Sequence, residues 1–204
     1  MVDEAVMYDG LIAVKDGRIA YVGDRQAGEE LYESEHVIDD PQAVVLPGFV
    51  DTHTHLGAHF FGTLCDEENV ITAVYDLWFP MEFAWDHETM FAASCLGVWD
   101  ALRSGVTTVG NDQYFAQATA EAVDTLGMRA LVSREINELS EPMPVHYDEA
   151  ARKYSISFDR RRAEAGLDEN IALIEQWRGH PRVTPCFGPH APDLLSGEML
   201  ERIA

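Results

Sequence analysis

The first part of the chain alternates apolar and polar positions in a way that predicts a small β-unit. Residues 11–23 read as two short strands joined at Asp16–Gly17, because an Asp-Gly pair suits the left-handed backbone of a two-residue hairpin loop. Further along, the run Val44–Leu46 is apolar on both faces, which is typical of a buried strand. We therefore expect a β-unit over residues 1–45 and a different domain over residues 46–204.

Beyond residue 45, short β-branched runs alternate with stretches of helical spacing. Apolar residues recur every three or four positions in three segments, which predicts helices over residues 87–104, 115–126 and 167–178. Strands are expected near residues 44–52, 106–111, 129–134 and 182–188. Regular alternation of strand and helix predicts parallel βα units, and four such units make half of an eightfold barrel. The predicted fold class is therefore α/β, the N-terminal part of a (β/α)8 TIM-type barrel, with a truncated chain.

The segments that connect these elements add two expectations. Residues 135–165, which are rich in acids and arginines, read as an insertion between a strand and a helix, on the face where such barrels carry active sites. Ser196 is expected to cap a last helix.

The charge of the chain limits the partners that it can bind. There are 36 acidic residues against 14 basic ones, and the formal net charge is -22. Such a charge disfavours nucleic acid and anionic membranes, whose phosphates need Lys and Arg for neutralisation. The acidic residues are spread over the whole chain, which suits a protein kept soluble at high salt, and a halophilic source is our hypothesis. We expect a cytoplasmic protein, because the sequence shows no signal peptide, no CxxC pair and no apolar run of membrane-spanning length.

Two histidines at the end of the first predicted barrel strand carry the main chemical signal. In the segment PGFVDTHTHL, His53 and His55 are two positions apart. Side chains at positions i and i+2 of a strand point to the same side, so one cation could bind both imidazoles. A buried strand leads directly into the pair, which argues against two surface histidines. The sequence therefore predicts that His53 and His55 are metal ligands.

The chain resembles the amidohydrolase superfamily, and within it the chlorohydrolase and aminohydrolase group. That group includes S-adenosylhomocysteine/methylthioadenosine deaminases and triazine hydrolases. Three motifs carry the resemblance: PGFVDTHTHL, GVTTV at Gly105–Val109 and FGPHAP at Phe187–Pro192. It implies a TIM-type barrel. It also implies that residues 1–45 are part of a composite β-sandwich in front of that barrel.

The resemblance also implies a mechanism. One divalent ion, zinc or iron in relatives, lowers the pKa of water, which then attacks a ring carbon bearing an amino or chloro group. In relatives a glutamate and an aspartate shuttle protons. Those residues and the remaining metal ligands are expected beyond Ala204. No catalytic residue is therefore assigned within the chain, and the isolated chain is expected to be inactive.

Three residues are carried over as substrate contacts. Glu82 matches a glutamate that binds a ribose hydroxyl in nucleoside deaminases of the group, and a solvated surface acid is the alternative. Arg134 matches a position that contacts the substrate, although a simple ion pair would explain it equally well. His190 matches a histidine that hydrogen-bonds the substrate ring.

Other polar and aromatic residues near these positions receive different interpretations. Trp78 and Trp85 flank Glu82 and could stack on a flat ring, but core packing explains them better. Asp112 is expected to bond loop amides. His59 and His146 are expected at the surface.

Two departures from the group's pattern weigh against an adenosine-type substrate. The sequence after Ala191-Pro192 is Asp193–Ser196 rather than Tyr-Thr-Cys-Ser, and Ala165–Gly166 occupies the stretch where adenosylhomocysteine deaminases place a second arginine. The larger class survives, namely hydrolysis of an amino or chloro substituent on a nucleobase-like or other N-heterocyclic ring. The alternatives are a cyclic amidase or imidazolonepropionase-like hydrolase, and a catalytically dead truncated homologue. The expected partners are a small-molecule substrate and a second copy of the chain.

Overall fold

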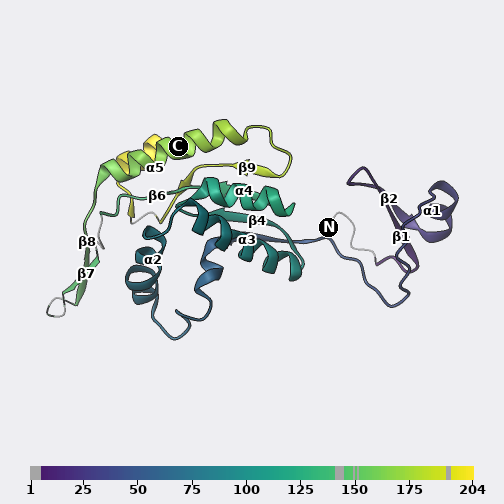
Figure 1. Ribbon diagram of the computed structural model, residues 1–204, viewed down its shortest axis with the longest axis horizontal. Helices are drawn as coiled ribbons and strands as arrows, with labels where there is room; N and C mark the ends of the chain where they lie inside the picture. The colour runs from purple at the N-terminus through teal and green to yellow at the C-terminus, as the bar shows by residue number, and fades with distance from the viewer. Residues whose placement is uncertain (1–5, 141–144, 149, 151, 192–193) are drawn as a thin grey trace. The chain divides into compact units, whose positions relative to one another are not determined.

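The computed structural model describes residues 6–140, 145–148, 150, 152–191 and 194–204. It divides into two compact units, Met1–Pro47 and Gly48–Ala204 (Figure 1). The first unit contains β1 (Gly10–Lys15), β2 (Arg18–Asp24) and α1 (Arg25–Leu31).

β1 and β2 form the antiparallel hairpin that the sequence predicts. Asp16 and Gly17 have φ values of 52° and 70°, which are the left-handed values that a two-residue loop needs. Asp24 then caps α1, because its carboxylate accepts a hydrogen bond of 3.0 Å from the Ala27 amide. A hairpin and one short helix do not make a sandwich by themselves, so the composite β-sandwich stays a prediction.

The second unit is an α/β structure. Its strands are β3 (Phe49–Thr54), β4 (Val106–Asp112), β5 (Arg129–Ser133), β6 (Glu135–Ile136), β7 (Val145–Asp148), β8 (Lys153–Ile156), β9 (Val183–Pro185) and β10 (Gly188–Pro189). Its helices are the 3-10 helix η1 (Leu56–Phe61), the π-helix η2 (Thr72–Trp78), α2 (Phe79–Phe83), α3 (His87–Arg103), α4 (Ala116–Leu126), α5 (Arg160–Trp177) and α6 (Gly197–Ile203). Among the described residues, no helix is long and apolar enough to cross a membrane.

A four-stranded parallel sheet organises the second unit, and its strands follow chain order, β3-β4-β5-β9. The connections run through α3, α4 and α5, and Figure 1 shows α4 and α5 running alongside the strands. β6 and β10 pair in parallel directly after β5 and β9, so two of the four strands continue past a short break. The α/β class with a parallel sheet is thus confirmed, and the carboxyl ends of neighbouring strands meet at one edge.

The core lies between this sheet and its helices. Apolar side chains from both layers form one cluster, made of Leu56, Val98, Val109, Ala116, Ala120, Val123, Met128, Ala130, Val132, Leu173 and Val183. Alanines dominate the contribution of α4, so this helix can approach the sheet closely. Gly105 and Gly127 follow the ends of α3 and α4, with φ values of 84° and 79° that glycine adopts without strain.

The strand predicted at Val44–Leu46 is wrong in position. β3 begins at Phe49, and the three apolar residues before it lie outside any strand and are exposed. The reason is the length of the neighbouring strand. Phe49 pairs with Val106, which is the first residue of β4, so the residues before Phe49 have no strand beside them.

The long insertion predicted at residues 135–165 is also shorter than expected at both ends. Glu135 and Ile136 belong to β6, and α5 begins at Arg160 rather than near Leu167. Asp159 caps this helix by accepting a 3.0 Å hydrogen bond from the Arg161 amide. The first turns of α5 carry three arginines and a glutamate, and the residues that they bury are small, Ala163 and Gly166. The apolar spacing therefore revealed only its second half.

Candidate active site

The predicted histidine pair lies at the carboxyl end of β3. His53 is in the strand and His55 follows it immediately, before η1. The centroids of their rings are 5.0 Å apart, with the ring planes nearly perpendicular. Two imidazoles that bind one tetrahedral ion through nitrogens about 2 Å away also have centroids about 5 Å apart. The donor set and its spacing therefore fit a shared divalent cation.

The hydrogen bonding of His55 determines which of its nitrogens can bind a metal. Its Nδ1 lies 2.5 Å from the backbone carbonyl oxygen of Asp112. A carbonyl can only accept, so Nδ1 carries the proton and Nε2 carries the lone pair. Burial lowers the pKa of His55, which keeps the ring neutral. Metal-binding histidines commonly have this arrangement, with one nitrogen donating to a carbonyl and the other on the ion.

The turn after the histidine pair is fixed to the end of β4. The Leu56 amide donates to the Asn111 side-chain oxygen at 2.7 Å, and the Gly57 amide donates to the Gln113 side-chain oxygen at 2.9 Å. On the other side, α3 packs directly on this backbone at Gly97, where a Cβ atom would lie 2.2 Å from the Leu56 carbonyl oxygen. The turn is therefore rigid, and so is the direction in which the second histidine points.

The two tryptophans that flank Glu82 in the sequence have different surroundings. Trp78 meets His55 edge to face, with centroids 4.9 Å apart, and also contacts Phe61. Trp85 packs on Phe61 and Phe60. Trp85 therefore has the packing role that the sequence analysis favoured. Trp78 in addition limits rotation of the His55 ring.

Glu82 is a buried carboxylate rather than a solvated acid. Its side chain comes from α2 and the residue is 0% exposed. One oxygen accepts a long hydrogen bond of 3.4 Å from the Tyr114 amide, and the other has no hydrogen-bond partner among the described residues. Burial raises the pKa of Glu82 to about 7. A carboxylate in this state can accept hydrogen bonds from a ligand that enters the site.

His190 faces two carboxylates from neighbouring strands. Its Nδ1 lies 3.3 Å from an Asp112 carboxylate oxygen and 3.7 Å from a Glu135 carboxylate oxygen. The other Asp112 oxygen accepts a 2.9 Å hydrogen bond from the Ser133 hydroxyl. These side chains, rather than the loop amides expected from the sequence, are the described partners of the Asp112 carboxylate.

Arg134 occupies the break between β5 and β6 and is nearly buried. Its Nε donates to a Glu169 carboxylate oxygen at 2.7 Å, so the ion pair considered from the sequence exists. Its guanidinium also lies over the Tyr114 ring, 4.6 Å from the centroid. Asn170 holds the backbone on both sides, accepting from the Arg134 amide at 3.1 Å and donating to the Arg134 carbonyl at 2.7 Å.

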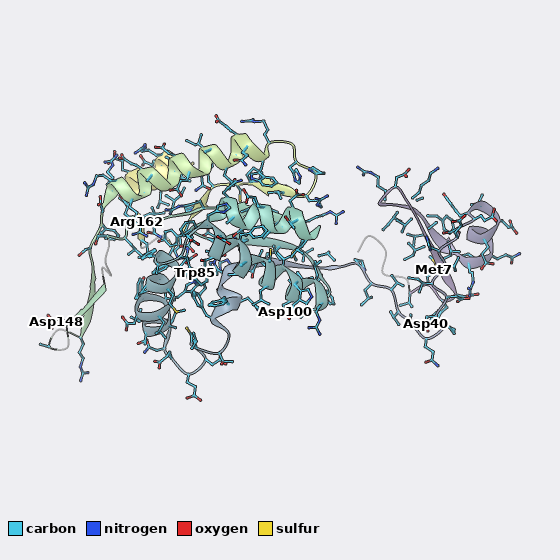
Figure 2. The ribbon with its side chains drawn as sticks, in the orientation of Figure 1. Met7, Asp40, Trp85, Asp100, Asp148 and Arg162 are labelled. Atoms are coloured by element: carbon cyan, nitrogen blue, oxygen red, sulfur yellow. The ribbon has the colours of Figure 1, made fainter. Side chains whose placement is uncertain are left out.

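An open pocket of roughly 480 Å³ lies beside this arginine. Its lining includes Arg134 and Arg162, together with the rings of Phe83 and Tyr114 and the carboxylate of Glu169. Arg162, labelled in Figure 2 near the beginning of α5, stacks on Phe83 at 4.2 Å and faces Tyr114 at 5.1 Å. Two cations held over aromatic faces suit a ligand that combines an apolar part with an anionic group.

The fold thus gathers the predicted site residues at one edge of the sheet. The ring centroids of His55 and His190 are 6.3 Å apart, and Phe79, from the helix that carries Glu82, packs on His190 at 6.0 Å. His59 is exposed and lies 3.7 Å from Asp100, as a surface residue would. The side chain of His146 lies outside the described residues.

Sequence reasoning missed Glu135. The residue is 1% exposed, and burial together with its carboxylate neighbours Glu82 and Asp112 raises the pKa of Glu135 well above its ordinary value. It directly follows Arg134 at the strand break, and that position was the only available signal. In a chain with 36 acidic residues, one more acid does not stand out.

Comparison with known proteins places this chain in a family. Residues 44–204 match the model of the amidohydrolase family. The chain belongs to the amidohydrolase family. The 5-methylthioadenosine/S-adenosylhomocysteine deaminase of Nitratidesulfovibrio vulgaris is 35% identical over 198 residues, which cover 97% of this chain and 41% of that protein. The chain thus spans about two fifths of the length of the curated relatives that it matches.

Solved structures of the amidohydrolase family share the fold. An adenosine deaminase from Xanthomonas campestris with bound zinc has a TM-score of 0.81 at 22% identity, covering 98% of this chain and 42% of that one. An atrazine chlorohydrolase from Arthrobacter aurescens, complexed with zinc, has a TM-score of 0.67 at 18% identity, covering 94% and 44%. The second unit of this chain therefore has the fold of the N-terminal part of an amidohydrolase barrel.

Proposed function

We propose that this chain forms the first half of the active site of a metal-dependent amidohydrolase, which removes an amino or chloro substituent from a nucleobase-like or other N-heterocyclic ring. The observation that carries the proposal is the pair His53 and His55 at the carboxyl end of β3, with Nδ1 of His55 bound to a backbone carbonyl. Relatives named as deaminases and a chlorohydrolase support the reaction class. The resemblance to the group puts the remaining metal ligands and the proton-shuttling residues outside this chain, which spans about two fifths of the length of the relatives that it matches.

In this proposal each residue has a distinct task. His53 and His55 would hold one divalent ion, zinc or iron, and the ion when bound would supply Lewis-acid activation of water. Glu82 would accept hydrogen bonds from hydroxyl groups of the substrate, through the carboxylate oxygen that has no partner among the described residues. His190 would hydrogen-bond the ring through Nε2, since its Nδ1 faces Asp112.

Arg134 would contact the substrate through its guanidinium group, which lies over the Tyr114 ring. Its ion pair with Glu169 does not exclude this task, because Glu169 is 55% exposed and the stacked guanidinium also lines the open pocket. We further propose that the molecule works as a homo-oligomer and that its substrate is a small molecule.

Histidine ring nitrogens report directly on the metal pair. We expect addition of Zn2+ to shift the Nε2 15N resonance of His55 and one ring 15N resonance of His53 in NMR spectra, while Nδ1 of His55 keeps its proton. His53→Ala and His55→Ala should each weaken Zn2+ binding at this pair by at least about 10-fold, since even loss of an outer-shell partner costs that much. His59→Ala is the control, because His59 lies at the surface. Resonances of both rings that do not respond to Zn2+ would remove the basis of the proposal.

The reaction class has its own test. The longest protein encoded by the gene should release ammonia or chloride from at least one compound in a panel of purines, pyrimidines and triazines. If it releases neither from any of them but opens cyclic amides, the activity is that of a cyclic amidase. That outcome would refute the deaminase and chlorohydrolase assignment while leaving the metal pair intact.

A further inference from the structure

A second group of metal-ligand atoms lies beside the histidine pair. Asp112, Glu135 and His190 come from the ends of β4, β6 and β10, and each offers one ligand atom within 4.8 Å of the other two. His190 Nδ1 lies 3.3 Å from an Asp112 carboxylate oxygen and 3.7 Å from a Glu135 carboxylate oxygen. Ligands about 2.1 Å from one ion are separated by roughly 3 to 4 Å, so small movements would bring the three atoms onto a single cation.

An independent observation points to a ligand in this group. The Glu135 oxygen that faces His190 is buried and has no hydrogen-bond partner among the described residues, and the residue is 1% exposed. The nearby Arg134 guanidinium donates to the backbone carbonyl of Glu135 rather than to its carboxylate. A buried carboxylate oxygen with no donor is costly unless something else binds it.

The surrounding charges favour a cation as that ligand. Glu82 and Glu135 are both completely buried, and each acts electrostatically on the other. Asp112 adds a third carboxylate, which is about one fifth exposed. A divalent cation placed among these oxygens would offset the repulsion that the carboxylates exert on one another when they are ionised.

The group is separate from the pair His53 and His55. Nδ1 of His55 lies 3.8 Å from a Glu135 carboxylate oxygen and is already bound to the backbone carbonyl of Asp112. His55 can therefore offer only Nε2, which points away from Nδ1. The ring centroids of His55 and His190 are also farther apart than those of the histidine pair, at 6.3 Å against 5.0 Å.

We propose that Asp112, Glu135 and His190 bind a second divalent cation. Two carboxylates and one imidazole are a ligand set that suits Mn2+ and also Zn2+. His190 would bind through Nδ1, so its Nε2 remains available to the substrate. The inference does not rest on the proposed function, because it concerns different ligand atoms.

Mn2+ is the probe that separates the two sites. In a titration followed by the electron paramagnetic resonance signal of free Mn2+, the chain should bind the ion, and the double variant His53→Ala/His55→Ala should keep that binding. Glu135→Gln should weaken it by at least about 10-fold. Asp112→Asn should act in the same way.

The matched control is Glu138→Gln, which removes another buried carboxyl three residues further along the chain, one that accepts bonds from Ser196 instead of facing His190. It should leave Mn2+ affinity unchanged.

Circular dichroism identifies any variant that has lost its fold, and if Glu135→Gln or Asp112→Asn does so, the other carries the test. Two results would overturn the proposal. One is wild-type Mn2+ affinity in the folded Glu135→Gln or Asp112→Asn chain, which indicates a hydrogen-bonded histidine and carboxylate cluster without a cation. The other is loss of binding in the double histidine variant, which indicates one ion shared by both groups.

Discussion

Replacing Glu82 by Gln tests whether this buried carboxylate reduces the stability of the fold. Glu82 is 0% exposed, and burial raises its pKa to about 7 from an ordinary value of 4.5. The variant keeps the shape of the side chain but cannot ionise. We expect Glu82→Gln to be more stable than the wild type at pH 8, and we expect this advantage to disappear as the pH falls to 4.5.

The sign follows from proton linkage. Below pH 4.5 the carboxyl is protonated in the folded and the unfolded chain, so it causes no difference in stability. Between pH 4.5 and 7 the unfolded chain ionises while the folded chain keeps its proton, and the free energy of unfolding falls as the pH rises. Above pH 7 the loss is complete, and it amounts to about 3 kcal/mol for this difference in pKa. Repulsion between Glu82 and Glu135 acts in the same direction.

Urea unfolding of both chains at several pH values between 4.5 and 8 measures this effect. The quantity to compare is the difference in the free energy of unfolding between the variant and the wild type, followed as the pH changes. The cost of burying the glutamine amide is the same at every pH, so it does not affect this change. Glu201→Gln, at an exposed position of α6, is the control and should show no such change. A Glu82→Gln chain whose stability follows the wild type in parallel across the whole range would refute the reasoning.

Two further predictions concern the strand break and the surface. Asn170→Ala should destabilise the fold by about 2 to 4 kcal/mol in urea unfolding, because it leaves the buried amide and carbonyl of Arg134 without their partner. Gln42→Ala, on an exposed turn, is the control and should cost under 1 kcal/mol or so. The net charge of -22 should make the melting temperature rise as KCl is added above about 0.1 M, because salt screens the repulsion between surface carboxylates. A melting temperature that does not change with salt would contradict the halophilic hypothesis.

Local signals in the sequence were sufficient for the elements that depend on local chemistry. The hairpin follows from Asp16–Gly17, whose backbone takes the required left-handed values, and α4 ends at Gly127 for the same reason. The alternation of strand and helix was sufficient for the parallel sheet. Boundaries set by a neighbouring strand were not predictable. Val44–Leu46 has the composition of a buried strand, but β4 is too short to pair with it.

The same distinction between local signals and contacts made by the fold applies to the candidate site. Spacing and resemblance indicated His53 and His55, and the structure adds the carbonyl that fixes the tautomer of His55. That carbonyl belongs to Asp112, 57 positions along the chain, so only the fold reveals it. Glu82 could be matched by resemblance, whereas its complete burial, which gives the carboxyl its unusual pKa, depends on the packing of α2 against Tyr114 and its neighbours.

The buried carboxylates are the part of this chain that stability alone does not explain. A core optimised for folding would replace Glu82 and Glu135 by apolar or neutral residues, since each has an oxygen without a hydrogen-bond donor among the described residues. Proteins keep such groups where a ligand uses them, at some cost in stability. Both oxygens lie at the carboxyl edge of the sheet, where His55 and His190 also meet, so the ligands that would satisfy them enter at the same edge. A substrate hydroxyl suits Glu82, which has a backbone amide on its other oxygen. A cation suits Glu135, which faces an imidazole and lies near two further acids. The stability measurement on Glu82 and the binding measurement on Glu135 therefore test the same idea, namely that the buried carboxylates which destabilise the fold are the groups that bind its ligands.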